Sequence, residues 1–593
     1  MPRRLSADPE VLDSIVRRLE ELVLAHSGAD PFEDIFRLIL AKLHLERAGV
    51  AGLGDPWAAL AGAAARWPAL LERGVTFGLP PAACEACAAL LAPLTLGEEG
   101  VEVLDALFES VTNQLAKGNK GQFFTPRQVI EACVRIADPQ PGERVLDPAC
   151  GSGGFLVEAL RRQPQARVSG VDFDGRAARV ARALLTVSGV EAPDVLCADA
   201  LGPLPDLGAV DLILTNPPFA GEVLDAAVLD GFALADVSRR VERDVLFLER
   251  CVQLLRPGGR LAIVLPHNKV GSAGWAYARR WLLQRVRVTA VLGLPRDTFL
   301  PHTSQKTAVI FGVKRPRPLQ ELPDEPVRFL ISERVGKDKR GRPVWRADAR
   351  SGTLWDDLDH DLAPLVLPTP PAGALFSEVG LHDLDEGDVL APGRYDPRRR
   401  TGRGGVPLLE LARLVTDAVS RRNGDAEARY VVLDTGHAGE GLVLHPRAPV
   451  PLAEIGSPKR VFAPGDVLLS RLRPYLRQVA WLDEGLFPEG AQVVGSPEFY
   501  TLRSVDDRSV AFLVPWLLSD PVQAVLAAAQ EGGHHPRVPA TLLEGLRVPE
   551  ALVARRDAVS AAVEQAVRGA RAAVDQLAGL REGVGAPVQV TGP

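Results

Sequence analysis

Short apolar runs alternate with helix-length segments between residues 144 and 313, and this alternation is the strongest constraint on the fold. The runs are "RVLDPA", "RVSGVD", "VDLILT", "RLAIVLP", "VTAVLGL" and "TAVIFGV". Strands that are apolar along their whole length are typical of a parallel sheet that helices cover on both faces. The sequence therefore predicts an α/β domain, in which the last run follows its neighbour closely enough to turn back antiparallel.

The segments on either side of this domain have different patterns. Residues 1–104 have apolar positions at helical spacing, with "ADPF" and "GDPW" as caps, and we expect a helical domain there. Residues 336–390 are charged and proline-rich, which predicts a linker with an exposed hairpin at "GKDKRGRP". Residues 391–550 are β-rich without the βα rhythm, and a long helix is expected in the segment 551–593.

Composition and charge exclude several classes of protein. The formal net charge of −7 argues against a chain that coats nucleic acid along its whole surface, although it allows a local basic groove. No apolar run approaches the ~20 residues that a membrane-spanning helix needs, and the first residues show no secretory pattern. Six scattered cysteines fit a reducing compartment, so we expect a cytoplasmic protein without a membrane partner. Cys84 and Cys87 form a C-x-x-C pair without a second pair or a histidine at metal spacing, so we expect no metal site.

Acidic residues close three successive strands of the predicted sheet. Asp147 precedes the glycine-rich turn in "DPACGSGG", Asp172 ends the next strand, and Asp199 follows in "LCADAL". Open α/β sheets bind ligands at the carboxyl ends of their strands, where these carboxylates would form a line. The line suits S-adenosylmethionine, with one carboxylate near its amino group, one at the ribose hydroxyls and one at the adenine amine. The alternative for each single aspartate is a helix cap.

The fourth strand ends in Asn216-Pro217-Pro218-Phe219, a tetrapeptide with little conformational freedom. The exocyclic amine of adenine or cytosine is a weak nucleophile, because its lone pair is delocalised into the ring. Two acceptors on its hydrogens, the Asn216 side-chain oxygen and the Pro217 carbonyl, would pull the nitrogen towards tetrahedral geometry. Phe219 offers a face on which an extruded base can stack. These residues indicate methyl transfer to an amine by positioning and electrostatic stabilisation, without a metal.

"DPACGSGG" followed by "TNPPF" resembles the amino methyltransferases that modify DNA, and "GQFFTPRQV" (121–129) narrows the resemblance. This segment is similar to the N-terminal cofactor segment in the modification subunits of type I restriction–modification systems and in similar N6-adenine methylases. The motif order matches the gamma arrangement. The resemblance implies a Rossmann-like, seven-stranded, S-adenosylmethionine-dependent methyltransferase sheet over residues 105–335.

The resemblance also assigns individual residues. Together with the acidic positions, the cofactor-binding residues are Gln122, Phe124, Thr125, Pro126, Asp147, Pro148, Gly151, Gly153, Asp172 and Asp199. The catalytic residues are Asn216, Pro217, Pro218 and Phe219, with Lys306 and Thr307 at the pocket edge. Asparagine in the first position of the tetrapeptide is typical of adenine enzymes, whereas serine is typical of N4-cytosine enzymes. We therefore expect N6 of adenine as the target, with N4 of cytosine by the same chemistry as the alternative.

Residues 391–550 resemble a single target recognition domain of a type I specificity subunit, fused here to the methylase. Residues 391–480 hold 15 Arg/Lys against 9 Asp/Glu, a basic surplus in an acidic chain. The expected contacts with double-stranded DNA are Arg471, Arg473, Tyr475 and Arg477. The segment 551–593 carries an apolar stripe and resembles a spacer helix, which packs within the chain or pairs two copies into a homodimer.

Two further hypotheses stay open at this point. One is methylation of a glutamine side chain in a protein, against which the basic C-terminal region argues. The other is a catalytically silent DNA-binding scaffold, against which the intact Asn216, Asp147 and Asp172 argue. The first 100 residues show no paired acidic residues with a lysine after a strand, so we expect modification without cleavage. Any restriction subunit would then be a separate chain.

Overall fold

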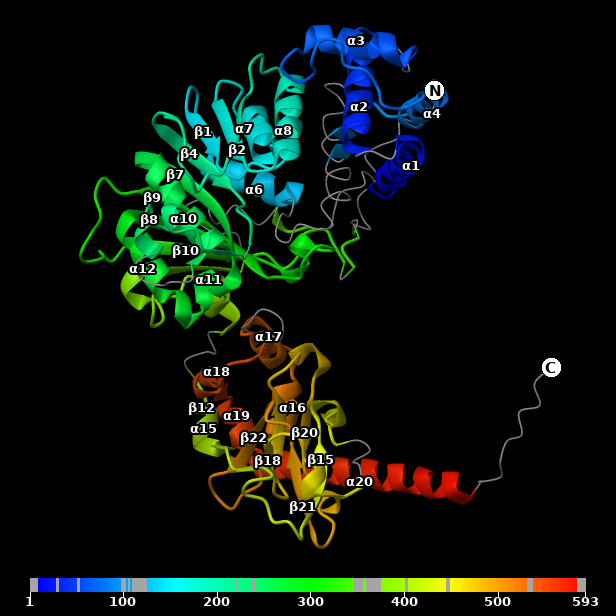
Figure 1. The fold of residues 1–593 in the computed structure, drawn as a ribbon. Helices are drawn as coiled ribbons and strands as arrows, with labels where there is room; N and C mark the ends of the chain where they lie inside the picture. The colour runs from blue at the N-terminus through cyan, green and yellow to red at the C-terminus, as the bar shows by residue number, and fades with distance from the viewer. Residues whose placement is uncertain are drawn as a thin grey trace, which may run out of the picture. The chain divides into compact units, whose positions relative to one another are not determined.

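The computed structural model describes residues 9–27, 31–50, 54–96, 103–104, 107–108, 125–219, 221–235, 241–338, 340–342, 344, 356–358, 375–399, 404–443, 448–530 and 537–583. The chain divides into two compact units, Met1–Pro392 and Gly393–Pro593 (Figure 1). Within the described ranges, no helix is both long enough and apolar enough to cross a membrane.

In the described residues between 9 and 96, four helices open the first unit, in agreement with the helical pattern of the sequence. They are α1 (Pro9–Ser27), α2 (Pro31–Arg47), α3 (Pro56–Arg66) and α4 (Pro81–Leu91). Asp55 caps α3, because its carboxylate accepts from the N–H groups of Trp57 (3.0 Å) and Ala58 (3.4 Å). The apolar face of α2 is fully buried, as Ile35 and Phe36 show.

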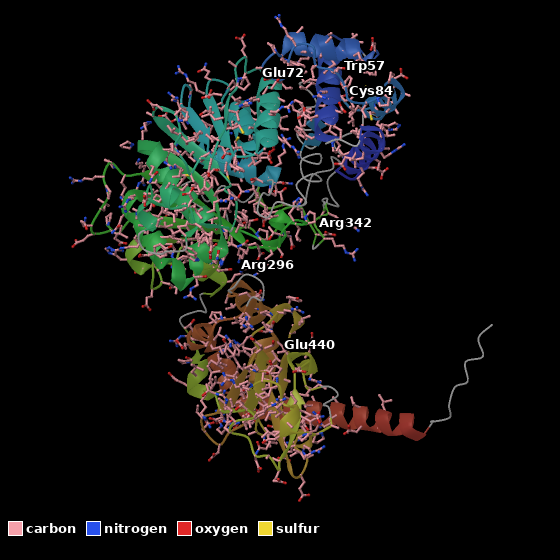
Figure 2. The ribbon with its side chains drawn as sticks, viewed as in Figure 1. Trp57, Glu72, Cys84, Arg296, Arg342 and Glu440 are labelled. Atoms are coloured by element: carbon pink, nitrogen blue, oxygen red, sulfur yellow. The ribbon has the colours of Figure 1, made fainter. Side chains whose placement is uncertain are left out.

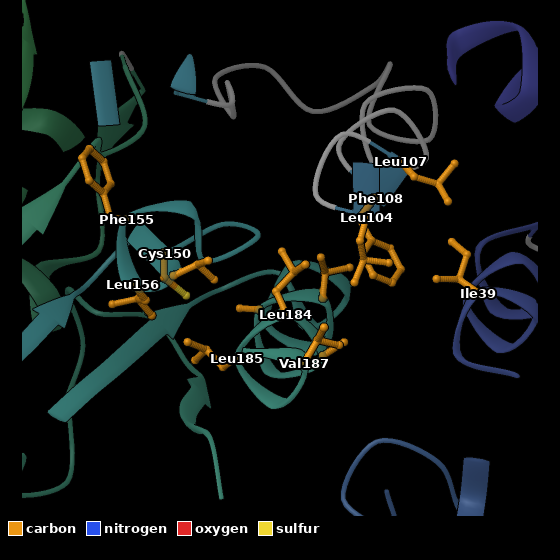
Figure 3. Packing of buried hydrophobic residues seen from close by; sticks show 14 of the residues in the cluster. Ile39, Leu104, Leu107, Phe108, Cys150, Phe155, Leu156, Leu184, Leu185 and Val187 are labelled. Atoms are coloured by element: carbon orange, nitrogen blue, oxygen red, sulfur yellow. The ribbon is translucent and has the colours of Figure 1, made fainter. Parts of the chain in front are cut away.

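These helices share one hydrophobic core with the sheet that follows them. Figure 3 shows Ile39 of α2 on one side of Phe108 and Leu184 of α8 (Gly175–Val187) on the other. The guanidinium group of Arg179, also on α8, lies 4.7 Å from the ring centroid of Phe36. The N-terminal helices are therefore packed against the layer of helices next to the sheet.

A mixed sheet forms the centre of the first unit, and the described residues give it nine strands in the order β11-β10-β8-β9-β7-β4-β1-β2-β3 (Figure 1). The strands are β1 (Arg144–Asp147), β2 (Arg167–Asp172), β3 (Asp194–Cys197), β4 (Val210–Thr215), β7 (Leu255–Pro266), β8 (Val286–Leu294), β9 (Thr307–Lys314), β10 (Pro326–Ile331) and β11 (Phe376–Gly380). β1, β2, β3, β4 and β7 are parallel, and β9 runs antiparallel between β7 and β8. The predicted α/β class and the reversed last run are confirmed.

The expected count of seven strands is wrong, because two further strands extend the sheet beyond β8. β10 pairs parallel with β8, and β11 pairs antiparallel with β10. β11 lies within residues 336–390, where the proline-rich composition predicted a linker. β10 starts at the exposed Pro326 and carries the half-buried Arg328 between buried apolar residues, so it lacks the continuous apolar run that marked the inner strands.

Helices pack on the sheet and deliver loops to its carboxyl edge. α7 (Gly154–Arg162) packs against β1, β2 and β4, whereas α8 packs against β2 and β3. α6 (Arg127–Ala137) contacts α7, β4 and β7, α10 (Arg243–Leu254) contacts β7, and α12 (Ala276–Arg285) contacts β8. Short elements between them are β5 (Glu222–Val223), α9 (Ala226–Leu229), β6 (Val241–Glu242) and α11 (His267–Gly271). Because the inner strands are almost wholly buried, the edge of the sheet is a rigid platform for the loops.

The second unit contains two five-stranded sheets in its described residues. One has the order β13-β22-β19-β20-β16, with β13 (Ala412–Val415), β16 (Glu440–Gly441), β19 (Val467–Ser470), β20 (Val479–Trp481) and β22 (Phe499–Ser504). The other has the order β14-β18-β21-β15-β17, with β14 (Ala418–Val419), β15 (Arg429–Leu433), β17 (Val450–Pro451), β18 (Lys459–Val461) and β21 (Ala491–Gly495). The remaining elements are β12 (Val406–Pro407), α15 (Leu408–Leu411), α16 (Leu513–Leu518), α17 (Asp520–Ala528), α18 (Ala540–Gly545) and β23 (Arg547–Val548).

A long helix closes the second unit, as the sequence predicted. It is α20 (Arg556–Gly583), and a single-turn helix α19 (Glu550–Val553) precedes it. Arg556 is buried and anchors α20, because its guanidinium donates to the Asp506 carboxylate at 2.7 and 2.9 Å. Val567 packs on the core of the unit, whereas Leu577, almost three turns further along α20, is 62% exposed. The predicted apolar stripe is therefore covered at its start and open at its end.

Candidate active site

The carboxyl edge of the sheet gathers polar residues from separate strands. β2, β1 and β4 are parallel neighbours, so their carboxyl ends meet at one edge. Asp147 is the last residue of β1, Asp172 is the last residue of β2, and Asn216 follows β4 directly. Three of the predicted site residues thus lie on adjacent strands.

The glycine-rich turn after β1 has a backbone that favours glycine. Gly151 and Gly153 have φ angles of 53° and 90°. A Cβ at Gly153 would lie 3.1 Å from the Cβ of Ala181, so this glycine lets the turn approach α8 closely. Gly151 instead faces open space, and its N–H donates to Asp172 Oδ2 at 2.8 Å. The turn therefore leaves an open stretch of backbone beside Asp172.

Asp147 and Asp172 are both buried, and burial changes their acidity. Asp147 is 1% exposed, Ala149 N donates to its Oδ1 at 3.0 Å, and burial raises its pKa to about 7. Burial also raises the pKa of Asp172, against the hydrogen bonds that it accepts from Asp174 N and Gly151 N, both at 2.8 Å. The two carboxyl groups are held by the backbone. Pro148, buried next to Asp147, is part of the same turn.

Asp199 is exposed, unlike these two aspartates, although its neighbour Ala198 donates from its N–H to Asp172 O at 2.9 Å. β3 ends at Cys197, two residues earlier than the predicted strand end, and Asp199 is exposed in the loop that follows. Its Oδ1 accepts from Leu201 N at 2.9 Å, which is the same bond from the second following residue that Asp147 and Asp172 accept from Ala149 N and Asp174 N. Its place in a cofactor site stays a prediction.

Phe173 is a candidate that the sequence interpretation missed. It follows Asp172 and is 76% exposed, which is unusual for a phenylalanine. The exposed Cys197 lies next to it, with Sγ 3.9 Å from Phe173 O. The sequence signal that could have identified Phe173 is its position directly after the acidic residue that ends the strand. A ring in this place can cover a planar heterocycle whose ribose is bound at Asp172.

The segment before α6 reaches the tetrapeptide. Thr125 Oγ1 accepts a hydrogen bond of 2.9 Å from Asn216 Nδ2, although the two residues are 91 positions apart. Pro126 is the N-cap residue of α6. The predicted residues Gln122 and Phe124 lie outside the described residues. Thr125 was expected over the cofactor, and the structure places it at the amide of Asn216.

The rest of the tetrapeptide is well packed. Pro217 is buried and Pro218 is half-buried, so the chain leaves β4 in one fixed direction. Phe219 is 4% exposed, and its ring packs edge-on against Phe299, with centroids 5.5 Å apart and an interplanar angle of 82°. The loop that carries Phe299 therefore supports the tetrapeptide from one side.

A neutral histidine lies at the end of β7, the strand next to β4. His267 N donates to Lys306 O at 2.8 Å, which ties this edge to the loop before β9. Burial, together with the charges of Lys306 and Arg296, lowers the pKa of His267 to about 3. Thr307, predicted at the pocket edge with Lys306, is fully buried at the start of β9. The predicted pocket edge thus consists of one half-buried cation and one buried hydroxyl.

The predicted DNA contacts of the second unit lie in the loop between β19 and β20, but their side chains differ in availability. Arg473 is exposed and Tyr475 is 63% exposed. Arg471 is half-buried, with its guanidinium 5.1 Å from the ring centroid of Tyr500. Arg477 forms an ion pair with Asp520. Of the four predicted residues, Arg473 and Tyr475 are therefore the two whose side chains are exposed to solvent.

Left-handed backbone marks the same loop. Arg473 and Arg477 have φ angles of 46° and 49°, which non-glycine residues seldom adopt. They flank a 3-10 turn, Pro474–Leu476. Such conformations cost of the order of 1–3 kcal/mol and concentrate at functional sites. The loop is therefore a local exception in an otherwise regular unit.

The cysteine pair of the N-terminal helices lies away from this edge of the sheet. Cys84 and Cys87 are buried in α4, and burial raises their pKa values to about 12 and about 11. Across the described ranges, no three or more His, Cys, Asp or Glu side chains come together in a way that could hold a metal ion.

The carboxyl edge of the sheet lies within the part of the chain that matches a known protein family. The model of the N-6 DNA Methylase family matches residues 101–339. The type I restriction enzyme EcoEI methylase subunit of Escherichia coli is 30% identical over 226 residues, which are 35% of this chain and 46% of that protein. The EcoKI methylase subunit of Escherichia coli (strain K12) is 29% identical over 238 residues, which are 36% of this chain and 44% of that protein. The chain thus spans less than half the length of these two relatives.

A solved structure resembles the whole chain in fold. The crystal structure of the type IIG restriction endonuclease BpuSI has a TM-score of 0.54 with 13% sequence identity. The similarity covers 94% of this chain and 74% of that one. At this level of identity the likeness concerns the fold, and it extends into both units.

Proposed function

We propose that the chain is an S-adenosylmethionine-dependent DNA methyltransferase that methylates N6 of adenine in a specific duplex sequence, as part of a restriction–modification system. The observation that carries the proposal is the 2.9 Å hydrogen bond from Asn216 Nδ2 to Thr125 Oγ1, at the edge that also holds Asp147 and Asp172. The match of residues 101–339 to the N-6 DNA Methylase family supports it. The sequence similarity to two methylase subunits supports it as well.

The residues at the carboxyl edge fit S-adenosylmethionine. The open backbone at Gly151 leaves room for a ligand against the turn. Each oxygen of Asp172 accepts one backbone N–H, so each keeps a lone pair for a ribose hydroxyl. Asp147 would hold the amino group and Phe173 would cover the adenine ring. When bound, the cofactor supplies an activated methyl group.

Asn216 and Pro217 act on the amine that receives this methyl group. The Asn216 amide donates through its nitrogen to the Thr125 hydroxyl, and its oxygen is the acceptor that we assign to the substrate amine. The Asn216 oxygen and the Pro217 carbonyl then accept from the two N–H bonds of the amine and localise its lone pair. As the nitrogen gains positive charge, the same two oxygens stabilise it electrostatically. The nitrogen would gain the methyl group as the sulfonium S–C bond breaks and a neutral thioether is left, and the extra proton of the resulting ammonium would be released to solvent.

The target base has to leave the duplex to reach this edge. Phe219 is the proposed stacking partner of the extruded base, and Phe299 holds its ring edge-on. Adenine is proposed over cytosine because the tetrapeptide starts with asparagine. The chemistry at the amine is the same for both bases, so the experiment below distinguishes them by the product.

The second unit is proposed as the target recognition domain. Its loop between β19 and β20 presents Arg473 and Tyr475, a cation and an aromatic ring that suit a DNA groove. The exposed Leu577 on α20 supports a homodimer in which two such helices pair and two recognition domains contact a symmetric site. A restriction subunit, if the system has one, is a separate partner.

The direct test is a transfer assay with the full chain, labelled S-adenosylmethionine and unmethylated duplex DNA. We expect label in N6-methyladenine for the wild type and none for Asn216→Ala, with unchanged affinity for S-adenosylmethionine by calorimetry. Label in N4-methylcytosine would keep the mechanism and correct the base. Label in protein, or no transfer by a wild type that binds the cofactor, would contradict the proposal.

A further inference from the structure

A cationic hairpin in the first unit has no part in the function proposed above. Residues 336–344, "GKDKRGRPV", contain four Lys/Arg and one acidic residue in a chain whose net charge is −7. The hairpin closes through hydrogen bonds from Val344 N to Gly336 O (2.8 Å) and from Asp338 N to Arg342 O (2.9 Å). Its described residues are 336–338, 340–342 and 344.

The hairpin is held against the loop 295–306. Lys337 Nζ donates to the carbonyl groups of Thr298 (3.2 Å) and Leu300 (3.0 Å). A Cβ at Gly341 would lie 2.8 Å from the backbone of Leu300, so the turn of the hairpin touches this loop closely. At its base, Val335 is buried in the core of the first unit. The hairpin is therefore fixed at both ends.

The loop 295–306 in turn contacts the proposed catalytic tetrapeptide. Phe299 lies between the two carbonyl groups that Lys337 binds, and its ring meets Phe219 with a centroid distance of 5.5 Å. The loop carries two cations, Arg296 and Lys306, against one acidic residue, Asp297. Figure 2 labels Arg296 on this loop and Arg342 on the hairpin. Two consecutive contacts thus connect the cationic hairpin to the tetrapeptide.

The arginines of the hairpin are exposed on a turn that hydrogen bonds close. Arg340 and Arg342 are both exposed. The Asp338 carboxylate accepts from the backbone N–H groups of Arg340 (2.7 Å) and Arg342 (2.9 Å), which locks the turn. A ligand would meet two guanidinium groups on a backbone that needs little further ordering, which lowers the entropic cost of binding.

We propose that Arg340 and Arg342 bind the DNA phosphates next to the base that occupies the active site. The inference rests on the proposed function, since only a DNA substrate puts phosphates there. An extruded base stays attached to its backbone, so its flanking phosphates lie close to the catalytic tetrapeptide. Guanidinium groups suit phosphate oxygens, and such contacts position the duplex without reading its sequence.

The test compares DNA binding by two full-length variants of equal charge. In Arg340→Gln/Arg342→Gln, both proposed contacts are removed. In Arg287→Gln/Arg317→Gln, two exposed arginines are removed at the amino end of β8 and in the loop after β9, at the opposite edge of the sheet. Dissociation constants for a short labelled duplex of arbitrary sequence are measured over a series of salt concentrations. Each phosphate contact that is lost reduces the slope of log K against log salt by about 0.9.

We expect a slope reduced by about 1.8 for the hairpin variant and the wild-type slope for the control variant. Both variants should bind S-adenosylmethionine as the wild type does. A hairpin variant with the slope of the control would overturn the proposal and leave the proposed methyltransfer untouched. A wild type that binds no duplex would overturn both, and the transfer assay would then show no label in DNA.

Discussion

Replacing Thr125 by valine removes one hydroxyl and keeps the shape of the side chain. That hydroxyl accepts the 2.9 Å hydrogen bond from Asn216 Nδ2, so the amide loses the partner that fixes its orientation. A hydrogen bond of this kind contributes about 0.5–1.5 kcal/mol, which corresponds to a loss of about 2- to 13-fold in kcat/KM. Because Asn216 is half-buried and water can replace part of the interaction, we expect the lower half of this range.

The assay is methyl transfer to duplex DNA under single-turnover conditions, with Thr125→Ser as the matched control. Serine keeps the hydroxyl, so the serine variant should retain most of the activity that valine loses. The affinity for S-adenosylmethionine should stay the same in both variants, since Thr125 contacts the amide of Asn216. Equal activity of the valine and serine variants would refute the role that we give to this hydrogen bond. A change in cofactor affinity without a change in the transfer rate would refute it too.

Three further predictions follow from the geometry. Burial raises the pKa of Asp147 to about 7, and only its ionised form attracts the cofactor's amino group. The affinity for S-adenosylmethionine measured by calorimetry should therefore fall with decreasing pH, approaching about tenfold per pH unit well below 7. Asp147→Asn should bind weakly at every pH, and a wild-type affinity that does not change with pH would contradict the role of Asp147. Tyr475→Ala should weaken binding of the recognised duplex by about 1.5–3 kcal/mol, as for one hydrogen bond from its hydroxyl to a phosphate. Arg473→Gln should lower the salt slope by about 0.9, and wild-type binding by both variants would exclude the loop as a DNA contact. Leu577→Asp should convert a dimer to a monomer in analytical ultracentrifugation, and a wild type that is already monomeric with and without DNA would contradict the dimer.

The inner strands of the sheet could be predicted because each is marked by a run of consecutive apolar residues in the sequence. A strand that is buried on both faces must be apolar along its length, and β1, β4 and β7 carry such runs. Parallel strands also bring their carboxyl ends to one edge. This is why Asp147, Asp172 and Asn216 could be grouped from their positions after the runs.

The outer strands were not predictable on the same grounds. β10 and β11 lie at the edge of the sheet, where only part of each strand is buried and charged residues are tolerated. Their pairing depends on neighbours that are far away in the sequence, such as Arg328 opposite Glu378. A pattern of consecutive apolar residues cannot reveal strands of this kind.

Side-chain environments account for the differences within the site. Asp199 was grouped with the other two aspartates, but β3 ends two residues before it and Asp199 is exposed, whereas Asp147 and Asp172 are buried. The partner of Asn216 is Thr125, and a contact across 91 residues leaves no local trace in the sequence. Likewise, the sequence could not show that Arg477 is paired with Asp520 while Arg473 is exposed. Each of these outcomes is decided by tertiary packing.

The central claim is tested most directly by single-molecule sequencing of DNA from an unmethylated host that expresses this chain, beside a host that expresses Asn216→Ala. The account predicts N6-methyladenine at every copy of one sequence motif in the first host and none in the second. Unmodified DNA in the host with the wild-type chain, or modification that persists with Asn216→Ala, would contradict it.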